Sequence, residues 1–543
     1  MTDPAAIVAA LRAEWSLDFR RVRRVLAASA AGASLGEAVA ASGLARRDVE
    51  AVLAAVSAPI PPELSAEPVL PDGPALAARM AGLAERLPPA RWRLDHVPAT
   101  AETMARRALY LGAEYELAGA SVLCLGDHDL TALAVGAVAP GAALSVVDID
   151  ERILDHIAGS APGAGLAVTA AWADLRLALP PSLTGTADLV FTDPPYTVDG
   201  MRLFLVRALE ALRPSGHGRI AFCFGTGERH LVKALEVQAL LGDLRLVLEA
   251  MLPGFNRYAG AEAIGARSDL YVCRPTTGAR VGEAAVPSAR RGSGPRGRRS
   301  PPRPAALIYT RGPASEEAQP APLPDAVKAA ALTPVADGTA VLVGAGWPGT
   351  AVALPEFFGR LAAWTTAARP GPCPFSGPPV INTAPDFAGA ALRALLLAAP
   401  EAAVLVLPRR EVADLDLPLL RAAYDLNEVP TGPGGDPAVL AALRKAPPPA
   451  DDAEAVLRHL VLHPGAKVGN AWRDALLAAA RTAGAPLTKN DARARIAAAI
   501  GDDHRILGLR TWELPLSALR RLSAAVRRPA AMEGTGVADP QQR

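Results

Sequence analysis

Cysteine, lysine and long apolar runs are all scarce in this 543-residue chain, and each scarcity excludes a class of protein. The four cysteines lie far apart and form no CxxC pair, which argues against a disulfide scaffold and against a cysteine-based zinc site. We therefore predict a reducing compartment and no metal ion. Only five of the 56 basic residues are lysines, so individual arginines are weaker evidence for a function than usual.

The distribution of apolar residues argues against a membrane or secreted protein. The most apolar stretch, residues 394–407, is interrupted by Pro400 and Glu401. Residues 1–15 lack the basic segment and the apolar core of a signal peptide. We expect a cytoplasmic protein with no membrane partner.

Charge and composition set the scale of the fold. The 56 basic and 55 acidic residues give a net charge of +1, which excludes a uniformly basic coat for nucleic acid. Half of the residues are hydrophobic, so a sizeable core can form. The length predicts two to four domains.

Residues 5–58 predict a helical, winged-helix-like domain. Ser34 can cap one helix together with the glutamate three residues on, and Gly43 can form the turn before a second helix. Arg46 and Arg47 on that second helix could contact DNA. A module used for packing or dimerisation is the favoured alternative, because two arginines are weak evidence in this chain.

The remaining chain divides by composition. Residues 59–75 are rich in proline and predict a linker before a Rossmann-like domain over 76–276. Residues 277–325, rich in arginine and proline, predict a disordered tether, with weak attraction to nucleic acid as the alternative. Residues 326–528 predict a mixed α/β to α-helical domain of unknown role, and residues 529–543 a disordered tail.

Apolar strands alternate with helices from residue 120 to residue 275. This α/β pattern predicts a parallel sheet covered by helices on both faces. Ligands on such sheets bind at the carboxyl ends of the strands, and the polar residues gather there.

The first strand is followed by Gly126, Asp127 and Asp129. A phosphate-binding loop would present several glycines and free N–H groups. Two carboxylates instead repel phosphate and attract cations. The loop therefore favours a ligand with an ammonium or sulfonium group over a dinucleotide.

Carboxylates also follow the second and third strands. Asp148 lies about twenty residues after the first turn, the spacing at which an acidic residue accepts ribose hydroxyl protons, with Asp150 as the second candidate. Asp174 could accept a hydrogen bond from an adenine amino group. The alternative is a set of surface carboxylates with no ligand.

The fourth strand ends in Asp193, Pro194, Pro195 and Tyr196. The prolines stiffen the loop and remove backbone donors, so that carbonyl oxygens and the Asp193 carboxylate face the pocket as acceptors. Tyr196 adds a flat apolar wall. Such a site can hold an amine by its N–H groups and leave the nitrogen lone pair free to attack carbon.

Together these motifs resemble the branched-chain polyamine synthase family, the N4-bis(aminopropyl)spermidine synthases. The resemblance covers about residues 10–276 and leaves the C-terminal half unexplained. It is carried by segments DHVPATAETMARRALYL, LGDHDLTALAV, VVDIDERILDHI, FTDPPYTVDGMRLFLVRALEAL and PGFNRYAGAEAIGARSDLYVCRPT.

The resemblance implies transfer of an aminopropyl group from decarboxylated S-adenosylmethionine, a co-substrate, to a spermidine-type polyamine. The products would be a branched polyamine and methylthioadenosine, and no cofactor would stay bound. An acidic pocket suits both cationic substrates. We expect Asp127 first and Asp193 second to take the proton of the attacking amine, and we expect a homodimer.

The chain departs from the family pattern twice. The family has G-D-D-D where this chain has Gly126, Asp127, His128 and Asp129, and it commonly has an acidic residue in place of Tyr196. His128 could change the choice of acceptor or accept a proton. The expected substrate-binding residues are Asp129, His128, Pro194, Pro195 and Tyr196; the expected cofactor-binding residues are Gly126, Asp148, Asp150 and Asp174.

Two other functions fit parts of the pattern. D-P-P-Y after a fourth strand also resembles amino-methyltransferases that use intact S-adenosylmethionine, typically with a glycine-rich first loop; the acidic loop argues against them. A DNA-binding regulator that senses polyamines would use the helix-turn-helix and the arginine-rich tether, and we consider DNA binding the weaker hypothesis.

Overall fold

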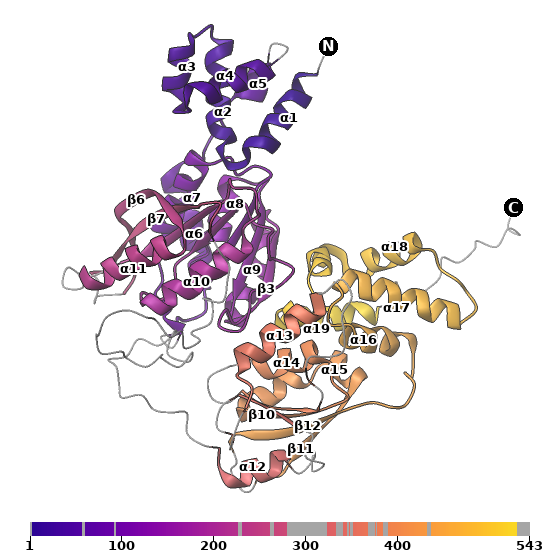
Figure 1. The fold of residues 1–543 in the computed structure, drawn as a ribbon. Coiled ribbons are helices and arrows are strands. Elements are labelled where there is room, and N and C mark those ends of the chain that lie inside the picture. Colours follow the sequence, from indigo (N-terminus) through magenta and orange to yellow (C-terminus); the bar gives the residue numbers. More distant parts are fainter. Residues whose placement is uncertain are drawn as a thin grey trace, which may run out of the picture.

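The computed structural model shows a small helical lobe, a central α/β domain and a C-terminal α/β domain (Figure 1). The structure describes residues 3–56, 60–91, 94–225, 231–260, 265–279, 323–332, 340–344, 347, 351–366, 375, 377–383, 389–431 and 436–528. Most of the predicted tether, the whole predicted tail and Cys373 lie outside these residues.

The N-terminal lobe is helical, as predicted. Ser34 accepts from the Glu37 N–H, the Glu37 carboxylate accepts from the Ser34 N–H, and Gly43 takes a left-handed φ of 65° at the turn. Its helices are α1 (Pro4–Trp15), α2 (Phe19–Ala30), α3 (Leu35–Ser42), α4 (Arg46–Ala55) and α5 (Pro62–Ser65), with a 3-10 turn at Ser16–Asp18.

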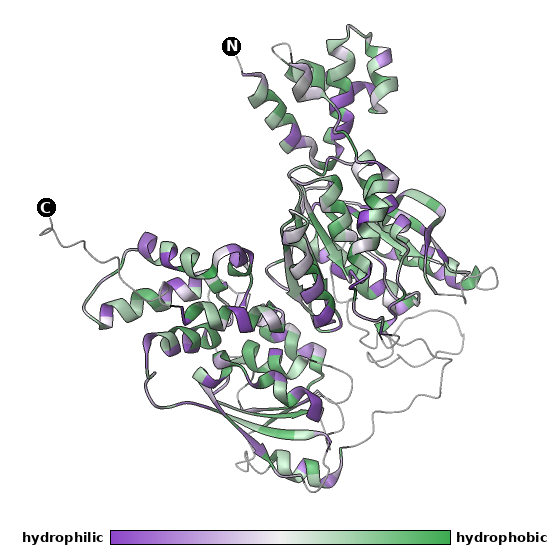
Figure 2. Ribbon diagram, turned by 180° about the vertical axis from the view of Figure 1, so that it is seen from behind, coloured by the Kyte–Doolittle hydropathy of each residue, from purple (hydrophilic) through white to green (hydrophobic). Residues whose placement is uncertain are grey.

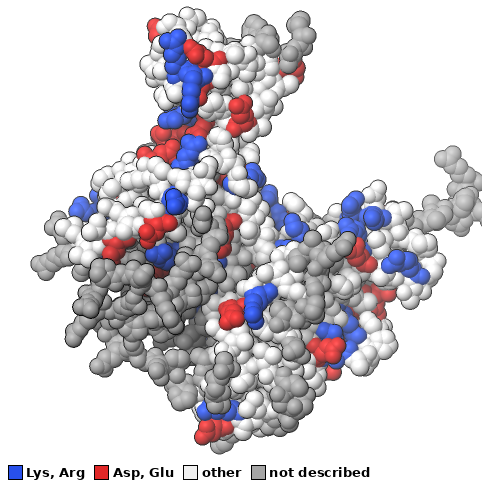
Figure 3. Space-filling view, viewed as in Figure 1, with Lys and Arg blue, Asp and Glu red and all other residues white. Residues whose placement is uncertain are grey.

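The described part of this lobe lacks the wing of a winged helix, because residues 3–56 and 60–72 contain no strand. Only the helix-turn-helix part of that prediction is borne out. Arg46 pairs with Glu50 at 2.8 Å and Arg47 with Asp48 at 3.2 Å, so both arginines have acidic neighbours. Figure 3 likewise shows blue and red side chains next to one another on this lobe.

The central domain is built on a seven-stranded sheet of order β3-β2-β1-β4-β5-β7-β6. The first five strands are parallel, but β7 is antiparallel to both β5 and β6. The expected fully parallel sheet is therefore wrong at this edge, because β6 and β7 pair as a long hairpin. The strands are β1 (Ser121–Leu125), β2 (Ala143–Asp148), β3 (Val168–Trp172), β4 (Leu189–Thr192), β5 (Arg219–Phe224), β6 (Leu246–Arg257) and β7 (Arg267–Pro275).

Helices cover both faces of this sheet, which confirms the α/β, Rossmann-like fold. Side chains of β1 alternate between two cores, because successive residues of a strand point to opposite faces: Leu123 and Leu125 pack on one side, Val122 and Cys124 on the other. Green residues accordingly line the interior in Figure 2. One face carries α10 (Val198–Ala211) and α11 (Leu231–Asp243); the other carries α6 (Gly73–Ala84), α7 (Ala101–Glu114), α8 (Thr131–Val138) and α9 (Glu151–Gly163).

The C-terminal domain has its own five-stranded sheet, of order β11-β12-β10-β9-β8, and its buried residues continue the core that α10 and α11 cover. Its strands are β8 (Val341–Val343), β9 (Pro379–Asn382), β10 (Ala402–Leu407), β11 (Tyr424–Val429) and β12 (Ala438–Arg444). Its α-helices are α12 (Asp325–Leu332), α13 (Leu354–Thr366), α14 (Ala390–Ala398), α15 (Pro418–Ala423), α16 (Asp452–Leu462), α17 (Val468–Thr482), α18 (Lys489–Ile500) and α19 (Leu516–Val526); 3-10 helices run over Arg409–Leu415, Gly501–Gly508 and Thr511–Glu513.

The described residues contain neither a membrane-spanning helix nor a metal-binding cluster. Within the ranges given above, no helix is both long and apolar enough to cross a bilayer. The same ranges hold no group of three or more His, Cys, Asp or Glu side chains arranged to bind a metal ion.

Candidate active site

A pocket lies at the carboxyl ends of the parallel strands. Since β1 pairs with both β2 and β4, the loops that follow these three strands meet at one edge of the sheet. The structure thus brings together most of the residues that the sequence singled out. The pocket is lined by Leu94, Asp95, His96, Val97, Gly126, His128, Asp129, Val147, Asp148, Ile149, Ala173, Leu175, Asp193, Pro194, Pro195, Tyr196, Phe204 and Tyr258.

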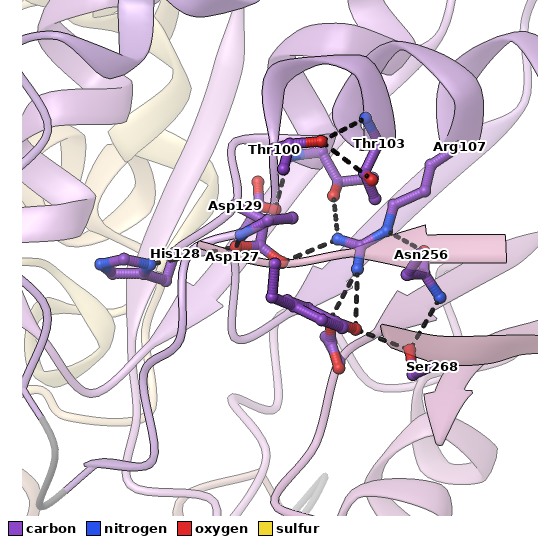
Figure 4. Close-up of polar contacts among 12 residues, drawn as sticks. Thr100, Thr103, Arg107, Asp127, His128, Asp129, Asn256 and Ser268 are labelled. Atoms are coloured by element: carbon purple, nitrogen blue, oxygen red, sulfur yellow. Dashed lines mark hydrogen bonds and ion pairs between the residues drawn. The ribbon is translucent and has the colours of Figure 1, made fainter. Parts of the chain in front are cut away.

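Arg107 of α7 joins two of the pocket carboxylates (Figure 4). Its Nη1 donates to Asp129 over 2.7 Å, its Nη2 to Asp193 over 2.6 Å, and its Nε to Asn256 over 2.8 Å. The Arg107 side chain is fully buried, so this ion pair is shielded from water. Asp129 also accepts from the Ala99 N–H at 2.8 Å. The guanidinium therefore fixes both carboxylates in place.

Asp193 sits at the centre of a hydroxyl network. Tyr196 donates to its Oδ1 over 2.9 Å, and Tyr258 donates to its Oδ2 over 2.7 Å. Burial raises the pKa of the Asp193 carboxyl and the neighbouring Asp129 carboxylate adds to this rise, while Arg107 and the two tyrosines oppose it. A raised pKa makes Asp193 a better proton acceptor than an ordinary surface aspartate.

Asp127, the first choice for that role, has a different position. It is 1% exposed and does not line the pocket. Its Oδ1 accepts from the Thr131 N–H at 2.7 Å and its Oδ2 from the Ala132 N–H at 3.0 Å, so it caps the first turn of α8. Burial raises the pKa of Asp127 to about 8. Both carboxylate oxygens of Asp127 face backbone donors, whereas Asp193 lines the pocket.

Asp148 keeps its predicted position and lines the pocket. It accepts from the backbone N–H groups of Asp127 at 3.0 Å and Asp150 at 2.8 Å, and burial raises its pKa to about 6. Each oxygen accepts one backbone bond and retains capacity for a second donor.

The structure places Asp150 and Asp174 outside the pocket lining, contrary to the sequence-based expectation. Asp150 caps α9 by accepting from the Arg152 N–H at 3.1 Å, and it also pairs with the Arg152 guanidinium at 2.5 Å. Asp174 pairs with Arg176 through contacts of 2.9 and 2.5 Å. Arginines pair with both carboxylates. Neither aspartate lines the pocket, although their neighbours Ile149, Ala173 and Leu175 do.

Gly126, Pro194 and Pro195 line the pocket as expected. Gly126 has a left-handed φ of 68°, which glycine adopts without strain, and this turns the chain out of β1. The two prolines present no N–H to the cavity.

His128 lines the pocket beside His96. Their rings lie 4.6 Å apart, and His128 is only 7% exposed. Burial and the nearby His128 lower the pKa of His96 to about 4, and burial also lowers the pKa of His128. Both rings are therefore neutral at pH 7 and can donate or accept hydrogen bonds.

Sequence reasoning missed Arg107, Tyr258 and His96. The signal for Arg107 was its helical spacing: with Thr103, Met104 and Leu111 it lies on the apolar, buried face of α7. A charged residue on such a face needs a buried partner. Tyr258 and His96 carried no comparable signal, because both lie in irregular segments that only the tertiary fold brings to the pocket.

Comparison with known proteins identifies the family. The family model described as the branched-chain polyamine synthase A C-terminal domain matches residues 75–273. The N(4)-bis(aminopropyl)spermidine synthase of Thermus thermophilus is 32% identical over 266 residues, which cover 77% of that protein and 44% of this chain. The chain belongs to the branched-chain polyamine synthase family.

Other members of the branched-chain polyamine synthase family match shorter stretches. The N(4)-bis(aminopropyl)spermidine synthase of Thermococcus kodakarensis is 32% identical over 170 residues, covering 31% of this chain and 48% of that protein. An uncharacterized protein of Methanocaldococcus jannaschii is 35% identical over 181 residues, covering 33% and 45%. The chain thus spans about half the length of these two curated relatives.

Among solved structures, the branched-chain polyamine synthase from Thermus thermophilus in complex with N4-aminopropylspermidine and 5'-methylthioadenosine is similar. It is 25% identical, covers 53% of this chain and 96% of that chain, and has a TM-score of 0.35.

Proposed function

We propose that this protein transfers an aminopropyl group from decarboxylated S-adenosylmethionine to an amine nitrogen of a spermidine-type polyamine. The observation that carries the proposal is the placement of three carboxylates, Asp129, Asp148 and Asp193, around one pocket in a member of this family. Both substrates are cations, and a partly buried acidic pocket attracts them even though the whole chain is nearly neutral.

The nucleoside of the donor fits the end of the pocket near β2 and β3. Asp148 can accept hydrogen bonds from the ribose hydroxyls at the carboxyl end of β2. Ile149, Ala173 and Leu175 form an apolar wall suited to the adenine ring. Asp150 and Asp174, engaged by arginines, are given no role in donor binding.

The reacting end lies near β4. Asp193 Oδ1 accepts one hydrogen bond, from Tyr196, and has capacity to accept a second from the acceptor amine. The amine nitrogen forms a bond to the aminopropyl carbon as the carbon–sulfur bond breaks. The sulfur keeps the electron pair of that bond and becomes the thioether of methylthioadenosine, and the amine proton passes to Asp193. Positioning of the two substrates supplies much of the rate.

The pocket also favours the decarboxylated donor over intact S-adenosylmethionine. None of the described residues that line it is lysine or arginine, and Arg107 is occupied behind the carboxylates. The carboxylate of intact S-adenosylmethionine would therefore meet Asp129 or Asp193 without a compensating cation. This repulsion makes an amino-methyltransferase, which uses the intact donor, the weaker alternative.

A binding experiment separates the two enzymes. Titration of the full chain with each donor by calorimetry should give the tighter binding to decarboxylated S-adenosylmethionine. Clear preference for the intact donor would overturn aminopropyl transfer in favour of methyl transfer. The exact acceptor, a homodimeric assembly and a cytoplasmic location remain predictions.

A further inference from the structure

The C-terminal domain contacts the central domain at the two loops that form the nucleoside end of the pocket. The first loop follows β2 and leads from Asp148 to Glu151, and the second follows β3. The family match ends at residue 273, before this domain begins. The contacts at both loops suggest a function for the C-terminal half, which the family resemblance leaves unexplained.

Arg393 of α14 makes the principal contact. Its Nη2 lies 2.5 Å from Glu151, which directly follows Asp150 at the start of α9, and 2.8 Å from the carbonyl oxygen of Leu514. Arg393 is 1% exposed. The second oxygen of Glu151 accepts from the Leu516 N–H at 2.8 Å, so the C-terminal domain engages both oxygens of this carboxylate.

The same arginine supports the wall of the pocket through Trp172. The Arg393 guanidinium lies 4.5 Å from the centre of the Trp172 ring, and the Trp172 Nε1 donates to the carbonyl oxygen of Ile149 over 3.1 Å. Ile149 lines the active-site pocket and also a second pocket between the two domains, which Trp172 and Arg393 help to line. Arg393 is therefore linked through Trp172 to the backbone of Ile149, a residue of the proposed adenine wall.

Gly389 shows how closely the domains approach at this point. It has a left-handed φ of 76°, and a Cβ atom there would lie 3.3 Å from the Trp172 ring. The Gly389 N–H donates to Glu411 over 3.1 Å, which holds the start of α14 against the tryptophan. A side chain at residue 389 would be strained at this φ, and the Trp172 ring or the start of α14 would have to shift to make room for it.

The loop after β3 has its own link to the C-terminal domain. The Ser182 N–H donates to Glu513 over 3.0 Å, and Arg510 donates to the Ser182 hydroxyl over 2.9 Å. Glu513 is completely buried. Both loops of the nucleoside end are thus held by buried charged residues of the second domain.

We propose that Arg393 is a positioning residue through which the C-terminal domain sets the geometry of the nucleoside-binding end of the active site. This rests on the proposed function, because it assigns that end to the nucleoside of the donor. Without Arg393, Glu151 loses its cation and Trp172 loses the guanidinium that packs on its ring. The hydrogen bond from Trp172 to the Ile149 carbonyl then loses the group that holds the tryptophan in place. The reacting end, held by Arg107, keeps its geometry.

The test compares Arg393→Met with Arg393→Lys in the full-length chain. Methylthioadenosine affinity is measured by calorimetry, and the KM of the polyamine acceptor by steady-state kinetics. We expect Arg393→Met to weaken methylthioadenosine binding about tenfold or more, since small displacements far from the reacting atoms have effects of this size. The acceptor KM should stay within about twofold. Arg393→Lys should restore only part of the affinity, because lysine keeps the charge opposite Glu151 but lacks the planar guanidinium over Trp172.

Arg421→Met is the matched control, because Arg421 is an exposed arginine of the same domain, paired with Asp416 on the surface. It should bind methylthioadenosine like the wild type. Gly389→Ala and Glu151→Gln test the contact from either side and replace Arg393→Met if that variant does not fold. Each should weaken nucleoside binding while sparing the acceptor KM.

The outcomes separate the two proposals. A wild-type chain that does not bind methylthioadenosine contradicts the proposed function itself. A wild type that binds it, with affinity unchanged in folded Arg393→Met, Gly389→Ala and Glu151→Gln variants, overturns the positioning role alone. The positioning role would also be overturned if the variants bound methylthioadenosine more weakly and raised the KM of the acceptor by the same factor, because equal effects at both ends of the pocket would indicate general damage to the fold.

Discussion

Asp129 and Asp193 lie on either side of the Arg107 guanidinium, which donates to the first over 2.7 Å and to the second over 2.6 Å. Two carboxylates this close would otherwise repel one another, and one would take up a proton. The buried arginine between them keeps both in place, with Asp129 further fixed by the Ala99 N–H. The pocket therefore holds its acidic groups ready before any substrate enters.

Replacement of Arg107 should damage both stability and activity. Arg107→Met leaves two buried carboxylates without their cation, and we expect the free energy of unfolding to fall by about 3–5 kcal/mol. Denaturant unfolding of both proteins measures this. Arg106→Met is the control, because Arg106 is exposed and donates to the Phe255 carbonyl. Equal losses in both variants would show that Arg107 has no special structural role.

Asp193→Asn should separate chemistry from binding. The amide keeps the shape and can still accept from Tyr196, but it cannot take a proton from the acceptor amine. We expect kcat to fall by about 100- to 10,000-fold, with methylthioadenosine affinity nearly unchanged, because Asp148 is intact. Single-turnover kinetics and calorimetry measure the two quantities. A variant with wild-type kcat would exclude Asp193 as the proton acceptor.

Asp127→Asn, unlike Asp193→Asn, should leave kcat nearly unchanged. Its carboxylate caps α8 and faces away from the pocket lining, so the variant should fold and retain most of its kcat. The folded-state pKa of about 8 lies above the ordinary value, so the stability that Asp127 contributes is present at low pH and is lost as the pH rises through about 8. Thermal unfolding should therefore show the wild type losing stability relative to Asp127→Asn from about pH 4, near the ordinary pKa of an aspartate, up to about pH 8, with no further loss above that. Complete loss of product with an intact fold would return the proton-acceptor role to Asp127.

The difference between Asp127 and Asp193 marks the limit of the sequence as a guide. The alternation of apolar strands with helices, and the polar residues that follow the strands, located the loops, so the parallel part of the sheet, its helices and the edge with the pocket were predictable. Which carboxylate faces the cavity depends on local hydrogen bonds. Backbone N–H groups of α8 bind the carboxylate of Asp127 away from the pocket lining. Arg152 pairs with Asp150, and Arg176 pairs with Asp174. The helical spacing of Arg107 showed that it needs a buried partner. Which residues Arg107 and Glu151 contact is decided by tertiary packing and could not be predicted from the sequence.

Nucleoside binding should depend on the ionisation of Asp148. Its pKa is raised to about 6, so it is charged above that pH and protonated below it. The charged form accepts ribose hydroxyl protons, and methylthioadenosine affinity should therefore fall about fivefold between pH 6 and pH 5. Calorimetry across this range measures the change. Asp148→Asn should bind more weakly and show no such dependence; an identical pH profile in the variant would place the titrating group elsewhere.

Product analysis tests the central claim most directly. The purified full-length chain is incubated with decarboxylated S-adenosylmethionine and a panel of di-, tri- and tetra-amines, and the products are identified by mass spectrometry. Aminopropyl transfer predicts an amine heavier by one or two aminopropyl groups, together with an equivalent amount of methylthioadenosine per group transferred. Unchanged amines with every acceptor, or methylated products from intact S-adenosylmethionine, would contradict the account.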